Sequence, residues 1–265
     1  MDTALRHQGP LVRVVDYVCS ARRGDRAFEE THGSMNVALV RRGVFTYRTE
    51  SRRDVLGPGD FLLGNAAEAY ECLHEHTDGD VCTCFEFTPR AVEAVAREHN
   101  LRRPRLHTSR ARSLRALALR VSDALLTESY EEVALSMLAE FLTDDAPKSA
   151  VRLTAPQIRR IGDVLRYVDA HYDEEIGLDE FAGVARLSPY HFLRVFRAHV
   201  GTTPHQYLTR VRLMRSAEAL RQSSESVTRV AFASGFRDLS HFTHCFKKAF
   251  GLSPGAYRTA RNPKS

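Results

Sequence analysis

A cluster of cysteines and histidines between residues 72 and 84 is the part of the sequence best suited to chemistry. Four of the five cysteines lie in the first half of the chain, and three of them fall within this segment. Side chains alternate between the two faces of a strand, so residues two apart share a face. Thiolates and imidazoles are the ligands that Zn(II) and other borderline-soft transition metals prefer. The candidate ligands of such an ion are Cys72, His74, His76 and Cys82.

The turn at Asp78-Gly79 decides whether Cys82 can join this set. A two-residue turn pairs His76 with Val81 and places Cys82 on the opposite face of the hairpin. A three-residue bulged turn instead sets Cys82 across from His74. The sequence allows both registers.

Two other interpretations of these cysteines remain open. They can pack as small hydrophobic residues beside surface histidines, or they can form a thiol-based redox or electrophile sensor. The sequence contains no nucleophile and base pair, phosphate-binding loop or metal triad of recognisable spacing. We therefore expect a protein that is not an enzyme.

The formal net charge of +5 is distributed unevenly along the 265 residues. Residues 1–150 hold 20 Lys and Arg against 23 Asp and Glu, whereas residues 151–265 hold 18 against 10. From Arg186 onward there are 14 basic and three acidic residues, a net charge of +11. A basic segment beside a slightly acidic one is typical of a nucleic-acid-binding module, although a solvated basic face has the same composition.

A repeat with an offset of fifty residues lies within the basic segment. Before the turn of each copy, Ala182 matches Ala231 with an offset of 49 in place of fifty, so the second copy has one extra residue in its turn. Each copy predicts a short helix, a turn and a second helix. The matched residues are His191-Phe192 with His241-Phe242, Phe196 with Phe246, Gly201 with Gly251, Pro204 with Pro254, and Tyr207 with Tyr257.

The second helix of each copy is bounded by residues that favour helix ends. Ser188 and Asp238 stand at the N-cap positions, and Gly201 and Gly251 stand at the C-terminal ends. Residues 206–221 continue as one arginine-rich helix that spaces the two copies. A basic helix presented by a shorter helix across a tight turn is the helix-turn-helix design, and such a helix fits the major groove of DNA.

The segment from Leu178 to Arg258 resembles the AraC/XylS family of bacterial transcription regulators. The resemblance rests on SPYHFLRVFRAHVGTTPHQYL at 188–208 and GFRDLSHFTHCFKKAFGLSPGAYR at 235–258. It implies two helix-turn-helix subdomains joined by a linker helix that bind double-stranded DNA as an activator or repressor. It also implies a homodimer that contacts RNA polymerase.

The family pattern assigns roles to residues of both recognition helices. Leu193 stands where a polar base reader is common, which favours contact with a thymine methyl group. His244 stands in place of the usual arginine, which weakens a bidentate contact with guanine. Arg197 and Lys247 would meet phosphates. The residues expected to face bases are Tyr190, Leu193, Arg194, Leu239, Ser240, Thr243 and His244.

The first ninety residues predict short strands separated by turns. Within them, GPGDFLLGN at 57–65 resembles the second motif of the cupin-like sensor barrel found in many members of this family. Leu62 and Leu63 stand where a cupin metal ligand would be, so we expect no cupin-type metal centre there. The expected fold is α+β with two domains: an N-terminal cupin-like antiparallel β-barrel with following helices, and a C-terminal all-α double helix-turn-helix domain.

The expected domains are 1–142 for sensing and dimerisation, 143–156 as a linker, and 157–265 for DNA binding. Within the last, helix-turn-helix 1 covers about 178–200, the linker helix about 205–221 and helix-turn-helix 2 about 227–250. Leu114, Leu117, Val121 and Leu125, then Val133, Met137 and Phe141, predict two helices that either pack on the barrel or expose a homodimer seam.

The sequence therefore predicts a sequence-specific transcription regulator controlled by a small effector or a metal ion at its N-terminal domain. An effectorless dimeric regulator and a thiol-based sensor are the alternatives. No apolar run approaches ~18 residues and no secretory signal is present, so we expect a cytoplasmic protein without membrane contact.

Overall fold

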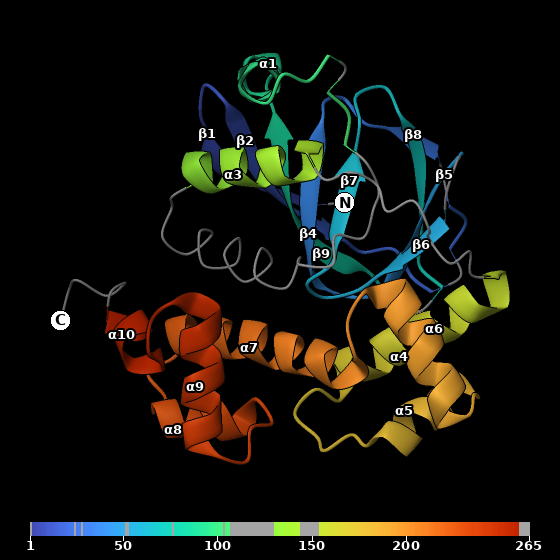
Figure 1. The fold of residues 1–265 in the computed structure, drawn as a ribbon, viewed down its shortest axis with the longest axis vertical. Coiled ribbons are helices and arrows are strands. Elements are labelled where there is room, and N and C mark those ends of the chain that lie inside the picture. Colours follow the sequence, from blue (N-terminus) through green and yellow to red (C-terminus); the bar gives the residue numbers. More distant parts are fainter. Residues whose placement is uncertain are drawn as a thin grey trace.

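The computed structural model describes residues 2–23, 25–27, 29–50, 53–75, 77–102, 104–106, 130–143 and 154–259. The chain is α+β, with antiparallel sheets in an N-terminal domain and helices in a C-terminal domain (Figure 1). None of the described helices is both long enough and apolar enough to cross a membrane.

The strands form two antiparallel sheets. The five-stranded sheet has the order β1-β2-β9-β4-β7, and the four-stranded sheet has the order β3-β8-β5-β6. The bounds in the larger sheet are β1 Asp2–Gln8, β2 Val12–Cys19, β9 Asp80–Phe87, β4 Asn36–Arg42 and β7 Phe61–Gly64. Those in the smaller sheet are β3 Glu29–Thr31, β8 Ala69–Leu73, β5 Phe45–Thr49 and β6 Arg53–Leu56.

The expected closed, cupin-like barrel is not confirmed. Among the described strands, the hydrogen-bonded ladders end at β1 and β7 in one sheet and at β3 and β6 in the other. The two sheets share an interior core, which makes the arrangement a sandwich. This core contains Ala38, Val40, Phe45, Tyr47, Leu56, Leu62, Cys82 and Cys84.

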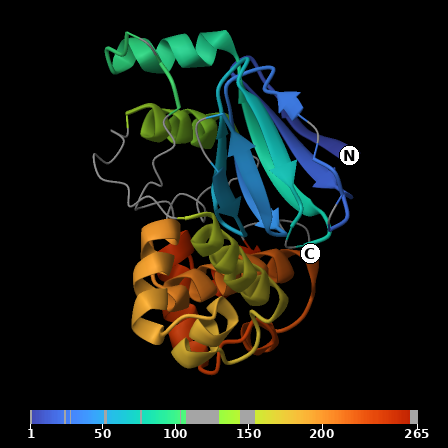
Figure 2. The same ribbon diagram turned by 90° about the vertical axis from the view of Figure 1, so that its right-hand side faces the viewer.

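Two helices cover the other face of the five-stranded sheet (Figure 2). Helix α1, Pro89–Glu98, begins after Thr88, whose side chain accepts a hydrogen bond from the Ala91 amide. In α3, Tyr130–Thr143, Met137 and Phe141 are buried against the sheet. The apolar stripe of α3 therefore packs on the sheet. The preceding predicted helix, Leu114 to Leu125, lies outside the described residues.

The helical domain is built around one long helix, α7. Its N-terminal half packs with α4, α5 and α6, and its C-terminal half packs with α8, α9 and α10, so two separate apolar cores share one spine. The bounds are α4 Ala155–Ala170, α5 Leu178–Ala185, α6 Pro189–Val200, α7 Pro204–Gln222, α8 Val227–Ala233, α9 Leu239–Phe250 and α10 Pro254–Thr259.

Candidate nucleic-acid interface and interior cavity

The two halves of the helical domain repeat the same helix-turn-helix geometry. In the first half, Arg186 takes a left-handed conformation with φ 52°, and the Leu187 amide donates to the Ala182 carbonyl. In the second, Gly235 has φ 83°, and the Phe236 amide donates to the Ala231 carbonyl. These contacts keep the offset of 49 predicted for this part of the repeat.

The recognition helices α6 and α9 keep the offset of fifty from their first residue to their last. The extra residue of the second copy therefore lies between Phe236 and Leu239, as the sequence predicted. Gly201 and Gly251 end the helices with φ 78° and 77°, a conformation in which a Cβ is strained.

The N-cap predictions differ in outcome. The Asp238 side chain accepts hydrogen bonds from the amides of Ser240 and His241 at 3.0 and 2.9 Å, as expected for an N-cap. Ser188 occupies the N-cap position of α6 as predicted, but its side chain makes no capping hydrogen bond. Pro189 lacks an amide hydrogen, so one fewer donor needs a partner at this end.

Most of the residues expected to contact DNA are exposed on the recognition helices, whereas Leu239 packs against the second apolar core. Tyr190 is 79% exposed, the largest exposure among the large apolar and aromatic side chains of the described residues. The apolar positions of the same helices, Phe192 and Phe196 in α6 and Phe242 and Phe246 in α9, are fully buried. Arg194, Arg197, Ser240, His244 and Lys247 are exposed, whereas Leu193, Leu239 and Thr243 are half-buried.

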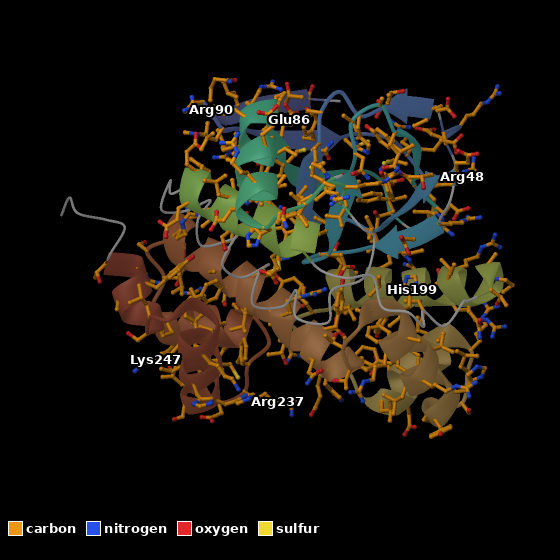
Figure 3. The ribbon with its side chains drawn as sticks, turned by 45° about the horizontal axis from the view of Figure 1, so that its top comes forward. Arg48, Glu86, Arg90, His199, Arg237 and Lys247 are labelled. Carbon is orange, nitrogen blue, oxygen red and sulfur yellow. The ribbon has the colours of Figure 1, made fainter. Side chains whose placement is uncertain are left out.

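The charge around these helices is basic. Lys247 of α9 lies on the part of the helical domain turned away from the sheets, as does Arg237 (Figure 3). Arg237 forms an ion pair with Glu175, so its charge is partly neutralised within the protein. Among residues 178–259, which the structure describes, the exposed cations that form no ion pair are Arg186, Arg194, Arg197, Lys247 and Lys248.

The arginines of α7 have partners inside the protein, which the sequence did not indicate. The Arg210 guanidinium is 3% exposed and lies 2.8 Å from the Asp60 carboxylate. Arg212 donates to the carbonyl of Tyr172 at 2.7 Å, and Arg215 lies 2.6 Å from Asp169. Part of the basic surplus therefore holds the helical domain together and attaches it to the sheets.

The turn between β6 and β7 docks directly on α7. A Cβ at Gly57 would lie 2.6 Å from the Tyr207 hydroxyl, and a Cβ at Gly59 would lie 2.6 Å from Arg210 Nε. Only glycine allows so close an approach, and Gly59 also has φ 83°. The sequence signal for this contact is an arginine on the apolar stripe of α7, three residues after the buried Tyr207.

Further contacts join the two domains, from the end of β4, the β4–β5 turn and β6. The Gly43 amide donates to the Asp169 carboxylate at 3.1 Å, and His199 Nε2 lies 3.4 Å from the Val55 carbonyl. Arg42 lies 3.1 Å from Glu218 of α7. Burial alone would raise the pKa of Glu218, but the hydrogen bond and charge of Arg42 with the charges of two neighbouring arginines lower it. This carboxylate therefore favours its ionised form at the interface.

A cavity of about 790 Å³ lies between the two sheets of the sandwich and opens to the solvent. Its wall includes the stacked rings of His32 and Tyr70, whose centroids are 4.1 Å apart. Leu62 lines it and offers no ligand atom. Charged side chains in the wall are Arg13, Glu30, Asp80 and Glu86, so carboxylates outnumber the cation.

The predicted hairpin of residues 72–84 is wrong in both of its registers. β8 belongs to the four-stranded sheet and pairs with β3 and β5, whereas β9 belongs to the other sheet and pairs with β2 and β4. Val81 and Phe85 of β9 point away from the cavity, and Cys82 points into it. Because both faces of β9 are covered, its pairing follows burial rather than the nearest turn.

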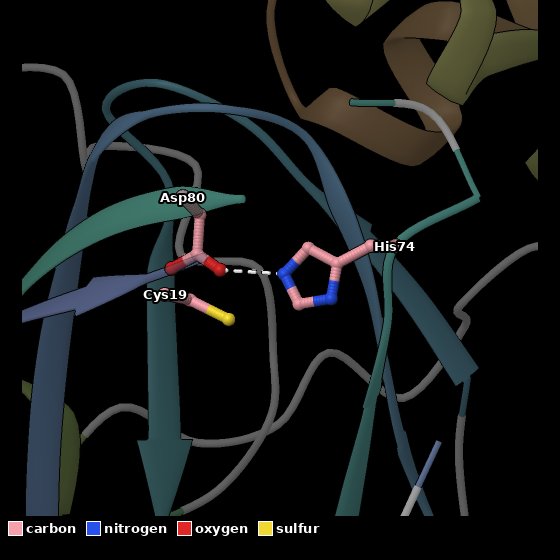
Figure 4. A group of neighbouring side chains, drawn as sticks. All are labelled: Cys19, His74 and Asp80. Atoms are coloured by element: carbon pink, nitrogen blue, oxygen red, sulfur yellow. Dashed lines mark hydrogen bonds and ion pairs between the residues drawn. The ribbon is translucent and has the colours of Figure 1, made fainter. Parts of the chain in front are cut away.

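The proposed ligands are therefore rearranged. Cys72 and Cys82 line the cavity from opposite sheets, and His76 lies outside the described residues. The ligand atoms of Cys19, His74 and Asp80 instead lie within 4.8 Å of one another (Figure 4). The sequence could have suggested Asp80 from its place two residues before Cys82, but Cys19 is distant and gave no signal.

The thiols of the cavity are held in their protonated form. Burial raises the pKa of Cys19, Cys72 and Cys84, and it raises the pKa of Cys82 well above its ordinary value. Nearby carboxylates, Asp80 above all, act in the same direction on Cys72 and Cys82. A protonated thiol is a weaker nucleophile than a thiolate, so these shifts lower the reactivity of the four cysteines.

Comparison with known proteins finds similarity along most of the chain. A family model described as "Helix-turn-helix domain" matches residues 181–260. The transcriptional activator RhaS of Klebsiella pneumoniae is 26% identical over 254 residues, which cover 89% of both chains. RhaS of Escherichia fergusonii is 35% identical over 103 residues, 39% of this chain and 37% of that one. The DNA-binding domain of AdpA, solved with a target DNA, is 31% identical, covers 40% of this chain and 98% of that chain, and has a TM-score of 0.38.

Proposed function

We infer that this chain belongs to the AraC/XylS family and is a DNA-binding transcription regulator, and we propose that α6 and α9 read bases in two successive segments of the major groove. The observation that carries this proposal is the repeat. It presents an exposed helix face twice, at equivalent positions on one spine, while the apolar face of each recognition helix stays in its core.

The spine has a length that suits this task. At a rise of 1.5 Å per residue, the 19 residues of α7 span about 28 Å, close to the ~34 Å that separates major-groove segments on one side of B-DNA. Each half of α7 is fixed in a different core, which prevents the two helix-turn-helix units from moving independently. The proposed site is therefore bipartite.

We assign base contacts to the exposed N-terminal part of each recognition helix. Arg194 is the residue suited to a bidentate contact with guanine, and half-buried Leu193 is suited to a thymine methyl group. Arg197 and Lys247, one turn further along each helix, are placed to neutralise phosphates. The remaining proposed base contacts are Tyr190, Leu239, Ser240, Thr243 and His244.

We further propose that a ligand in the cavity of the sandwich controls DNA binding. A ligand shifts the equilibrium between two states only if it binds them with unequal affinity. The turn that carries Asp60 joins β6 and β7, strands of the two sheets that border the cavity, and contacts Arg210 in the spine. A change in the spacing of the sheets can reach α7 along this contact. Because the N-terminal domain contains a cavity, control by a bound ligand is favoured over regulation without an effector.

The family resemblance also supports two assembly partners, a second copy of the chain and RNA polymerase. A homodimer would place two bipartite readers on one promoter and extend the recognised site. These partners complete the proposed function, which is the control of transcription rather than DNA binding alone.

Selection of DNA fragments by the purified full-length protein tests the proposed function. Sequencing of the retained fragments should reveal an asymmetric motif with two conserved blocks about ten base pairs apart, because the two recognition helices differ in their exposed residues. Retention without an enriched motif would show binding through phosphates alone and would contradict base reading. Fragments carrying a single short block would contradict the participation of both helices.

A further inference from the structure

We propose that Cys19, His74 and Asp80, with Cys82 as fourth ligand, form a site for a Zn(II)-class divalent cation in the cavity of the sandwich. Such a cation would be the ligand that controls DNA binding from the N-terminal domain, and in this respect the inference rests on the proposed function. It departs from the set expected from the sequence by exchanging Cys72 and His76 for Cys19 and Asp80.

Strand pairing explains why these side chains meet. In the ladder between β2 and β9, Cys19 lies opposite Asp80 and Tyr17 lies opposite Cys82. Directly opposite residues of an antiparallel pair point to the same face, and residues two apart on one strand do as well. Cys19, Asp80 and Cys82 therefore share the cavity face of one sheet. His74 reaches them from the segment that follows β8 of the other sheet.

The distances are close to those of a tetrahedral ion. His74 Nε2 lies 2.7 Å from Asp80 Oδ2, and Cys82 Sγ lies 3.2 Å from Asp80 Oδ1. The ligand atoms of Cys19, His74 and Asp80 all fall within 4.8 Å of one another. With bonds of about 2.0–2.3 Å, a tetrahedral zinc ion separates its ligand atoms by about 3.3–3.8 Å. Cys19, His74 and Asp80 reach this spacing with shifts of about 1 Å, whereas Cys82, which is close to Asp80 but lies outside this group of three, needs a larger shift.

Burial and charge favour an occupant that is a cation. The His74 side chain is 5% exposed and that of Asp80 is 11% exposed, so the carboxylate is held away from bulk water. The cavity wall carries Glu30 and Glu86 in addition to Asp80, against the single cation Arg13. This excess of negative charge attracts a cation and repels an anion. Because two thiol protons leave when a divalent ion binds, the net charge of the cavity wall does not change. On binding, each cysteine thiol releases its proton to the solvent and coordinates as a thiolate.

The chemistry of the ligand atoms selects the type of ion. Two sulfurs, one imidazole nitrogen and one carboxylate oxygen suit zinc and similar borderline ions, whereas calcium and magnesium require oxygen ligands. Four ligands from the protein correspond to a closed site, which binds an ion without leaving a position for substrate. The site therefore fits sensing or structural stabilisation and not catalysis.

Titration of the metal-free full-length protein with Zn(II) tests the site, with Co(II) as a spectroscopic substitute. One ion per chain should bind, and the Co(II) form should show the thiolate-to-metal charge-transfer absorption of a cysteine-ligated site. Cys19→Ser and Asp80→Asn should each weaken Zn(II) binding by at least about 100-fold, because even residues that only orient a ligand contribute about 10–100-fold. Cys84→Ser, two residues beyond Cys82 on the same face of β9, should leave the affinity unchanged.

Two competing assignments are separated within the same experiment. Cys245 Sγ and His241 Nε2 on α9 lie 3.3 Å apart, so each titration is repeated with Cys245→Ser, and binding confined to that pair would overturn the proposal. Loss of binding in Cys72→Ser but not in Cys19→Ser would overturn it as well. Thermal unfolding of each variant tests whether it is folded. If Asp80→Asn does not fold, the zinc affinity of the conservative variant Cys19→Ser decides the outcome.

DNA retention by the same samples separates this inference from the proposed function. Protein that binds DNA but takes up no zinc would overturn the metal site and leave the regulator intact. Protein that takes up one zinc ion per chain but retains no DNA would uphold the metal site and contradict the proposed function.

Discussion

Replacement of Phe246 by alanine is expected to unfold the second helix-turn-helix subdomain while the sandwich stays folded. Phe246 is fully buried. The centroid of its ring lies 5.4 Å from that of Phe242, 4.4 Å from that of Phe250 and 5.1 Å from that of Tyr257. Removal of so large a buried ring typically lowers the free energy of unfolding by about 3–5 kcal/mol. That loss is comparable to the whole stability of a small core.

Amide hydrogen exchange of the full-length protein measures this effect, because it reports local unfolding element by element. In Phe246→Ala, the amides of α8, α9 and α10 should exchange much faster than in the wild-type protein, and those of β2 and β9 should not. Phe196→Ala is the matched control, since Phe196 occupies the equivalent position in the first copy. Its core also includes Val44 and Val55, so that variant should loosen the contact with the sheets. Equal protection of α9 in Phe246→Ala and wild type would refute the separation into two cores.

DNA affinity of the full-length protein should fall steeply with salt concentration. About four or five exposed cations near the recognition helices are free to neutralise phosphates, and each releases a counterion, with a slope in log K against log salt of about −0.9 per contact. Raising the salt from about 50 to about 200 mM should then weaken binding on the order of 10²-fold. The arginines of α7 are excluded from this number because they are paired inside the protein.

Fluorescence anisotropy with a labelled duplex measures the slope. Arg197→Ala and Lys247→Ala should each make the slope shallower by about one and should weaken binding to all sequences alike. Arg215→Ala, which removes a cation paired with Asp169, should leave the slope unchanged. An affinity that does not depend on salt would show that these cations do not meet the DNA backbone.

The helical domain could be predicted in detail because its signals are local. The extra turn residue, the two terminal glycines and the Asp238 cap each act within a few residues of their position, and the repeat supplied the helix-turn-helix pattern twice. The linker helix was predicted at 206–221 and spans Pro204–Gln222. Ser188 is the exception, because the side-chain bond of a cap depends on a rotamer that the sequence does not specify.

The sandwich could be predicted only as strands, because strand pairing is not local. The expected pairing of β8 with β9 followed the Asp78-Gly79 turn, but β9 is a central strand that needs neighbours on both edges. The alternation of side chains shows which residues share a face of a strand and does not show which strands are neighbours. For the same reason Cys19 was missed, since its partner Asp80 is 61 positions away.

The basic surplus was assigned to DNA too broadly. Arg210, Arg212 and Arg215 all belong to the charge excess, yet each has a partner within the protein. Asp60 precedes Arg210 by 150 residues, so no sequence window contains both members of the pair. Composition shows that a segment is basic, and only the fold shows which of its charges reach the solvent.

DNA selection with full-length Arg194→Ala, compared with the wild-type selection, tests most directly whether the recognition helices read bases. The account predicts that the block of the motif read by α6 loses sequence preference, by about 1–3 kcal/mol at the base pair that Arg194 contacts. The block read by α9 should be unchanged. An unchanged motif, or an equal loss of affinity on all sequences, would contradict it and would assign Arg194 to the DNA backbone.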